Sequence, residues 1–142
     1  MLPFVGEFRH SLDNKGRLII PSKYRQSFGE KIFLCKGFEP CLLIVTPEEI
    51  EKIEKKVRED SLTNKAVRTF SRAFFSGMVD VGFDSQGRIL VPANLREYAG
   101  ITEDVVVAGT GFYVEIWDRK AWEDNDLDKD RASIADFLEG II

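Results

Sequence analysis

The sequence predicts an α+β protein, mainly β, in which two similar halves interleave into one pseudo-two-fold barrel. A nine-residue stretch occurs twice, as Asp13–Pro21 and again 71 residues later as Asp84–Pro92. In each copy a turn precedes an apolar run that is too short for a helix. Each copy covers roughly fifty residues, which barely bury enough surface to be stable alone. We therefore expect the two copies to complete one shared core.

Each copy begins with a turn and a short strand. An Asp followed three residues later by Gly is typical of a tight turn, because Asp bonds the backbone ahead of it and Gly accepts a positive φ. The apolar runs that follow, 18–20 and 89–91, are expected to be buried strands. The turn-forming residues are Asp13 and Gly16 in the first copy, and Asp84 and Gly87 in the second.

A short helix and a hairpin should follow each strand. Pro21 and Pro92 suit the first turn of a helix, and Gly29 and Gly100 lie where a C-terminal cap belongs. The same offset aligns Arg25 with Arg96. The remaining strands are expected at 4–12, 31–36 and 41–45 in the first half, and at 79–83, 105–108 and 112–117 in the second, with 109–111 as the last turn.

Two helices are expected between the copies. Thr46 and Pro47 begin the first as an N-cap and a first-turn proline, and it should run for about fourteen residues. The second covers 64–75, and its Phe-rich end at 70–75 is expected to be exposed. After the second copy, Asp118 is expected to cap a short helix before Trp122, and the apolar residues of a last helix should serve either the core or a subunit contact. The chain thus divides into a first repeat (4–52), a helical connection (53–74), a second repeat (75–123) and an acidic tail with a candidate helix (124–142).

Composition is that of an ordinary globular protein. The chain is 44% hydrophobic and 31% charged, and it contains no apolar run long enough to span a bilayer. Without a signal-like N-terminus, the protein is expected to stay in the cytoplasm. Cys35 and Cys41 have neither CxxC spacing nor a clustered His, so we interpret them as buried thiols and expect no metal or cofactor.

Charge is unevenly distributed along the chain. The net charge is −4, yet residues 1–72 hold fourteen Lys or Arg against ten Asp or Glu, whereas residues 73–142 hold six against fourteen. This asymmetry indicates a side that faces a polyanion. Arg and Asn can read base edges, and Lys contacts phosphate. The DNA-binding candidates are therefore Arg9, Asn14, Lys15, Arg17 and Lys23 around the first turn, and Arg88 in the second copy.

A simpler interpretation assigns the two motifs to structure alone. The Asp13–Arg17 and Asp84–Arg88 pairs would then be intramolecular ion pairs that stabilise two turns. An arginine can nevertheless pair with its Asp and read a base. The second copy is poorer in cations, because Gln86 takes the place of Lys15 and Asn94 the place of Lys23.

The doubled motif, Asp-x-x-Gly-Arg followed by Pro at residues 13–21 and 84–92, resembles that of the MraZ family of bacterial transcriptional regulators. The resemblance extends from Phe4 to about Trp122. It implies an AbrB-like swapped-hairpin barrel and ring-like homo-oligomers. It also implies binding to short repeats in double-stranded promoter DNA ahead of the division and cell wall gene cluster, and hence association with the nucleoid.

Carried over by position, the family's motif falls on Asp13 and Arg17 and on Asp84 and Arg88. Lys15 matches the basic position of the first motif. The second motif departs from the family's pattern at Gln86. This departure leaves a mainly structural role open for Arg88.

Other classes of function fit the sequence less well than DNA binding does. Asp13 and Asp84 could form a carboxylate dyad, but the Arg four residues after each favours ionisation of both carboxylates over a shared proton. The sole histidine, His10, lies on an expected strand, and the sequence contains no recognisable Gly-rich phosphate loop. We expect no enzyme activity, no small-molecule substrate and no membrane partner. The alternative is an antitoxin-like protein-interaction module or ring scaffold that uses 70–75 and the tail.

Overall fold

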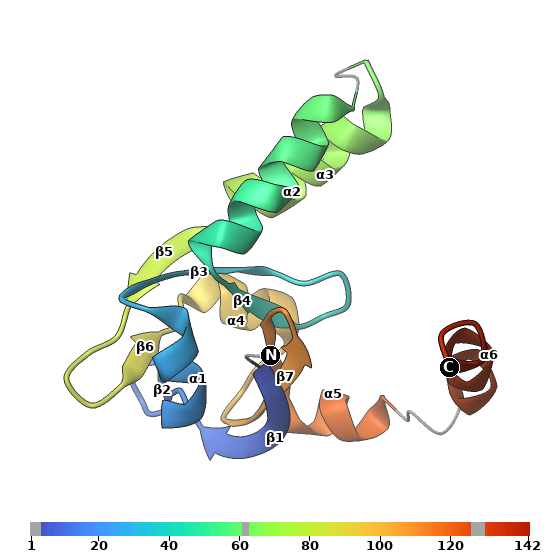
Figure 1. Ribbon diagram of the computed structural model, residues 1–142. Helices are drawn as coiled ribbons and strands as arrows, with labels where there is room; N and C mark the ends of the chain where they lie inside the picture. Colours follow the sequence, from blue (N-terminus) through green and yellow to red (C-terminus); the bar gives the residue numbers. More distant parts are fainter. Residues whose placement is uncertain (1–3, 61–62, 126–129) are drawn as a thin grey trace.

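The computed structural model describes residues 4–60, 63–125 and 130–142, so residues 126–129 of the expected tail lie outside the described residues. The first half contains β1 (Phe4–Ser11), β2 (Arg17–Ile19), α1 (Ser22–Phe28), β3 (Lys31–Lys36), β4 (Leu42–Val45), α2 (Pro47–Glu59) and α3 (Lys65–Ser76) (Figure 1). The second contains β5 (Val79–Gly82), β6 (Arg88–Leu90), α4 (Ala93–Ala99), β7 (Asp104–Gly111), β8 (Val114–Asp118), α5 (Arg119–Asp124) and α6 (Arg131–Glu139). The chain is thus a mixed α+β protein.

The two halves interleave in one six-stranded antiparallel sheet of order β1-β7-β8-β4-β3-β5. The first strand of each half pairs with a strand of the other, β1 with β7 and β5 with β3. Replacing every strand by its counterpart in the other half reverses this order, so the sheet is symmetric about the central β4–β8 pair. The strand order therefore has the two-fold symmetry that the duplication predicts.

A second, two-stranded sheet repeats this symmetry. In the antiparallel ribbon β2–β6, Leu18 lies opposite Ile89, and these two residues occupy equivalent positions in the two copies. Arg17 lies opposite Leu90, and its equivalent Arg88 lies opposite Ile19. The pseudo-two-fold axis therefore passes through the middle of the ribbon.

The large sheet is open, so the barrel that the sequence predicted is not confirmed. Its outer strands are β1 and β5, and no ladder joins these two strands in the described residues. The short strands β2 and β6 pair with each other and add nothing to either edge. The ribbon is held in place by the opposite turns, because Ile20 N–H donates to the Gly87 carbonyl at 3.1 Å and Val91 N–H to the Gly16 carbonyl at 2.9 Å.

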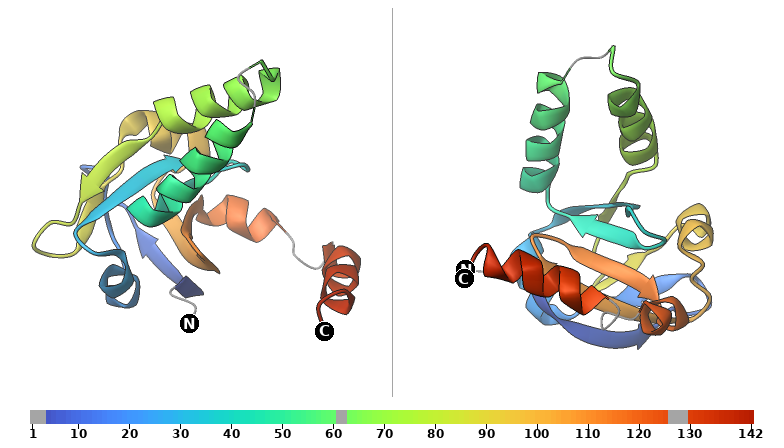
Figure 2. Two further views of the ribbon diagram at one scale, coloured as in Figure 1. Left: turned by 45° about the horizontal axis from the view of Figure 1, so that its top comes forward. Right: turned by 90° about the vertical axis from the view of Figure 1, so that its right-hand side faces the viewer.

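The sheet separates two apolar layers. Successive residues of a strand point to opposite faces, and in β4 Leu42 and Ile44 enter one layer while Leu43 and Val45 enter the other. The first layer includes the inner face of the ribbon and the apolar residues of α1 and α4. The second lies at the base of α2 and α3, which rise together from the sheet on the side away from the ribbon (Figures 1 and 2).

The two short strands are half-buried, although their continuous apolar runs predicted full burial. Leu18 and Ile89 are buried, but Ile19 is 44% exposed and Leu90 56% exposed. Only one face of the ribbon packs on the core, so alternate residues differ in burial. Each strand also begins at the motif arginine, one residue before the apolar run.

The β7–β8 hairpin turns at residues 112 and 113, later than the sequence predicted. Gly109 instead pairs with Gly6 inside the sheet. A Cβ added at Gly109 would lie 2.6 Å from the carbonyl carbon of Phe4. This glycine therefore serves a close approach of two backbones and does not form the turn.

The starts of α2 and α5 were predicted well, whereas the burial of the Phe-rich segment was not. Pro21 and Pro92 are the N-cap residues of α1 and α4, one position before the predicted first turn. Thr46 caps α2 by accepting the Glu49 N–H at 3.3 Å, and Asp118 caps α5 by accepting the Ala121 N–H at 3.4 Å. Phe74 is buried, and the neighbouring rings of the 70–75 segment are partly buried against it. None of the helices in the described ranges combines the length and apolar character needed to cross a membrane.

Candidate nucleic-acid interface

The first turn is held by the side chain of Asp13. Its Oδ1 accepts the backbone N–H groups of Lys15 and Arg17, both at 2.9 Å, and its Oδ2 accepts Nε–H of Arg17 at 2.6 Å. Gly16 closes the turn with a φ of 81°. The bond from the Arg17 backbone N–H, together with that from the Arg17 side chain, lowers the pKa of Asp13 to about 2. The carboxylate is therefore ionised at neutral pH and fixes both the turn and the arginine.

The second turn repeats this geometry. Asp84 Oδ1 accepts the N–H groups of Gln86 at 2.8 Å and of Arg88 at 2.9 Å, and its Oδ2 accepts Nε–H of Arg88 at 2.7 Å. Gly87 has a φ of 76°. Here too the backbone bond from Arg88 lowers the pKa of the carboxyl group. Asp84 and Gly87 therefore form a turn of the same geometry as Asp13 and Gly16.

Two further arginines brace the turns from the opposite half, and the sequence did not assign them this role. Nε of Arg25 donates to the Ile20 carbonyl at 2.9 Å, and Nε of Arg96 donates to the Val91 carbonyl at 3.1 Å. The guanidinium of Arg25 lies over Gly87 and that of Arg96 over Gly16, with no room for a side chain at Gly87. The only signal in the sequence was the alignment of Arg25 with Arg96 at the repeat offset.

The solvent face of the ribbon carries both motif arginines. Side chains of a strand alternate between its faces, so Arg17 and Arg88 point away from the core that buries Leu18 and Ile89. Nη1 of Arg88 lies 3.8 Å from Oδ2 of Asp13, which joins the motifs of the two halves. The ribbon thus brings together Arg17 and Arg88, which are 71 positions apart in the sequence.

The two arginines are not equally available for a ligand. Asp13 holds Arg17 through Nε, and no hydrogen bond ends on the terminal nitrogens of Arg17 within the described ranges. Arg88 contacts two carboxylates, and its side chain is 21% exposed against 32% for Arg17. The geometry therefore satisfies the ion-pair interpretation and still leaves the outer end of Arg17 open.

The other DNA-binding candidates from the sequence are not all close to this face of the ribbon. Asn14 and Lys15 are exposed at the tip of the first turn. Lys23 is exposed in the first turn of α1, which begins beside the second turn. Arg9 lies on β1 and forms an ion pair with Glu123 of α5 at 3.0 Å. The ribbon and its turns thus carry Asn14, Lys15 and the two motif arginines, with Lys23 beside them on α1, whereas Arg9 lies elsewhere.

One group of potential metal ligands lies elsewhere. Donor atoms of Glu39, Cys41 and Glu115 come within 4.8 Å of one another. Burial raises the pKa of Cys41 to about 12, as it does that of the buried Cys35. A thiol binds metal as the thiolate, so these cysteines have the properties of packed, protonated thiols at neutral pH.

Comparison with known proteins agrees with the duplication. The family model described as "MraZ protein, putative antitoxin-like" matches residues 3–73 and again residues 74–136. Three similar proteins are named "Transcriptional regulator MraZ". The protein from Acetivibrio thermocellus is 51% identical over 84% of either chain. Those from Clostridium tetani and a Thermoanaerobacter species are 46% and 44% identical, over 95% and 96% of this chain and 96% and 97% of their own.

The doubled Asp–Arg turns, the symmetric pairing of the two halves and these matches over nearly the whole length agree with one another. The chain belongs to the MraZ family.

Proposed function

We propose that this chain is a sequence-specific, DNA-binding transcriptional regulator that reads promoter DNA with the solvent face of the β2–β6 ribbon. The observation that carries the proposal is the pair of Asp-held arginines on that face. The major groove admits a two-stranded ribbon, and Arg binds O6 and N7 of guanine with two hydrogen bonds. A guanidinium fixed through Nε presents its terminal nitrogens in one orientation, which favours such a bidentate contact.

Residues around Arg17 complete this interface. Lys15 supplies a cation for phosphate, and Asn14 supplies an amide that can read adenine. Ile19 and Leu90 lie exposed beside the arginines and offer apolar contact to thymine methyl groups. Because Arg88 shares two carboxylates, it contributes less to base contacts than Arg17 does. Lys23 and Arg9 contribute to DNA affinity through long-range electrostatic attraction to the phosphates.

The proposal includes assembly on repeated sites. With a net charge of −4, one chain has little nonspecific attraction to DNA, so several subunits must act together. The proposal also includes an AbrB-like swapped-hairpin arrangement with one pseudo-dimeric unit per chain, which the interleaving of the two halves supports. A ring-like homo-oligomer of such units would bind short promoter repeats ahead of the division and cell wall gene cluster and remain with the nucleoid. The names of the three relatives also favour a regulator over an enzyme.

The test is to titrate labelled DNA from upstream of the protein's own gene with the protein, at two salt concentrations. Binding is measured by fluorescence anisotropy. Arg17→Ala should weaken specific binding by about 1–3 kcal/mol per engaged subunit. Arg88→Ala should weaken it less. Arg58→Ala is the matched control, because Arg58 is an exposed, ion-paired arginine at the end of α2, on the far side of the molecule from the ribbon (Figure 1).

The same titration separates the regulator from the scaffold. Sequence preference with a steep loss of affinity at higher salt supports DNA binding. Weak binding without sequence preference would favour the protein-interaction module instead. Normal operator binding by Arg17→Ala, with an unchanged circular dichroism spectrum, would show that Arg17 only stabilises its turn.

A further inference from the structure

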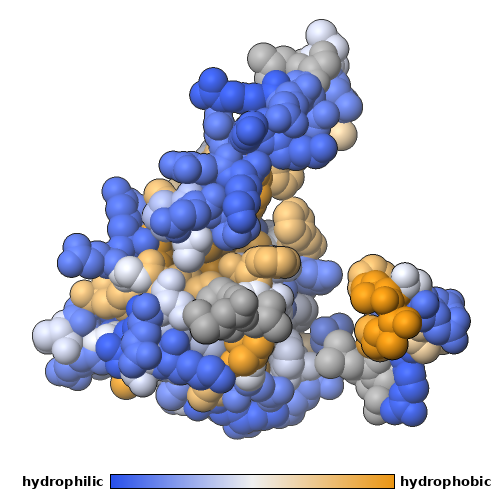
Figure 3. Space-filling model, in the orientation of Figure 1, coloured by the Kyte–Doolittle hydropathy of each residue, from blue (hydrophilic) through white to orange (hydrophobic). Residues whose placement is uncertain are grey.

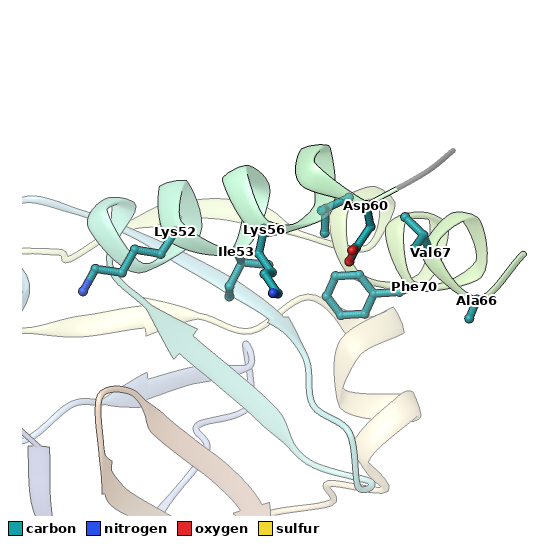
Figure 4. A pocket seen from close by; sticks show the side chains of 8 residues that line it. Lys52, Ile53, Lys56, Asp60, Ala66, Val67 and Phe70 are labelled. Atoms are coloured by element: carbon teal, nitrogen blue, oxygen red, sulfur yellow. The ribbon is translucent and has the colours of Figure 1, made fainter. Parts of the chain in front are cut away.

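The α2–α3 hairpin carries an apolar groove toward its far end (Figure 4). The groove encloses about 440 Å³. Its apolar walls are Ile53 and Val57 of α2 and Val67 and Phe70 of α3, with Lys52 and Lys56 along one side. No residue of α2 is buried, although its apolar side chains lie along one face. Two helices alone leave this stripe partly open, and a third helix would complete the packing.

Helix α6 has the matching, unpartnered surface. Its apolar side chains follow the i, i+3, i+4, i+7 spacing that places them on one face. They are Ile134, Phe137 and Leu138 of α6 and Ile141 just beyond its end, which are 45%, 70%, 43% and 64% exposed. Figure 3 shows them as a hydrophobic cluster on a segment that stands away from the rest of the chain. This spacing is that of the anchors by which an amphipathic helix binds a groove.

The α3 side of the groove is also complementary in charge to α6. Helix α3 carries Lys65, Arg68 and Arg72 and no acidic residue. Residues 130–139, which form α6 and its N-cap, contain three acidic residues against one arginine. Opposite charges on the two elements favour their approach and disfavour contact of α6 with a second acidic helix.

We propose that α6 of one copy docks into the α2–α3 groove of a second copy, as the third helix of a bundle formed between chains. Within one chain the two surfaces lie apart in every view (Figures 1 and 2). Helix α5 packs on β7 and β8, with Ala121 and Trp122 in the apolar layer at the base of the hairpin, and six residues separate α5 from α6. Six residues reach at most about 20 Å, which is only the length of α2 itself. A second copy presents the same groove without the restraint of this short connection, so we take the partner to be a second copy.

This contact joins different surfaces of two identical chains. Such a head-to-tail contact closes into a ring when the rotation between copies allows it. The inference deepens the assembly part of the proposed function and gives it an interface. It does not depend on which bases the ribbon reads.

Two full-length variants test the contact, each disabling one side. Phe137→Asp places a charge on the docking face of α6. Val67→Asp places the same charge in the groove, at the third position of α3, where the helix dipole tolerates an acidic residue. Ala132→Asp is the control, because Ala132 lies on the opposite face of α6 from Phe137 and Ile134. Mass is measured by light scattering without DNA, and folding by circular dichroism.

Wild type and Ala132→Asp should form the same assembly, whereas Phe137→Asp and Val67→Asp should each fall to the 16.2 kDa monomer. An equimolar mixture of the two monomeric variants should form a dimer, since one chain keeps a groove and the other a helix. A monomeric wild type, an unchanged mass for Phe137→Asp, or a mixture that stays monomeric would each overturn the proposal. Affinity for a single DNA repeat should be the same in Phe137→Asp as in wild type. Loss of DNA binding in an intact assembly would count against the ribbon and not against this contact.

Discussion

One position sensitive to a small substitution is Gly87, at the end of the second turn. Its φ of 76° lies in the region that disfavours any residue with a Cβ. An added Cβ would lie 2.5 Å from Cζ and 2.7 Å from Nε of Arg25. The guanidinium cannot move away without cost, because its Nε donates to the Ile20 carbonyl at 2.9 Å.

Gly87→Ala should therefore carry two costs. The positive φ costs about 1 kcal/mol for a non-Gly residue. Displacing Arg25 breaks a charged hydrogen bond and leaves the Ile20 carbonyl without it, which costs about 1–2 kcal/mol more. The sum, about 2–3 kcal/mol, corresponds to a fall in melting temperature of about 4–12 °C for a chain of this size.

Urea unfolding at matched protein concentration measures this cost. Gly100→Ala is the control, since Gly100 has a φ of 65° but nothing within 4 Å of an added Cβ. It should lose only the backbone part, about 1 kcal/mol. In an Arg25→Ala background the steric part should vanish, giving a coupling of about 1–2 kcal/mol. Equal losses for Gly87→Ala and Gly100→Ala, or strict additivity with Arg25→Ala, would refute the brace.

Three other predictions concern pH, folding and DNA geometry. The pKa of Asp13 is lowered in the folded state to about 2, so its stabilising effect is complete above the ordinary value of 3.8 and is lost as the pH falls toward 2; the stability difference between wild type and Asp13→Asn should shrink over that interval, and a constant difference would contradict it. Fragments 1–72 and 73–142 should each give poorly dispersed amide spectra, because β1 and β5 find their partners in the other half; a dispersed spectrum from either fragment would mean independent domains. Repeats spaced by about 10–10.5 bp should bind about 10²–10⁴-fold more tightly than a single repeat, and a half-turn insertion should remove most of that gain; equal affinity for all three DNAs would exclude multivalent binding.

Much of the site could be predicted from the sequence because its contacts are local. Asp13 binds groups two and four residues ahead of it, and Gly16 is required by the same turn. Helix caps such as Thr46 also depend on neighbours within three residues. The second copy of the motif then showed that these patterns recur and that the two halves are equivalent.

Other features depend on residues far apart in the sequence, and only the tertiary structure decided them. The run 18–20 does not reveal which residues face the core, and the ribbon's packing on one side exposes Ile19. The sequence predicted that Gly109 lies in a turn, but in the structure Gly109 pairs with Gly6 where two strands approach closely.

The contacts of Arg25 and Arg96 with the opposite turns also depend on the tertiary structure. Arg25 binds the Ile20 carbonyl, but it lies over Gly87 only because the two-fold pairing brings the opposite turn to that position. The contact between Arg88 and Asp13 exists for the same reason. The sequence by itself therefore determined the turns, the motif arginines and the duplication, whereas the packing of one half against the other determined which side chains are buried, braced or open to a ligand.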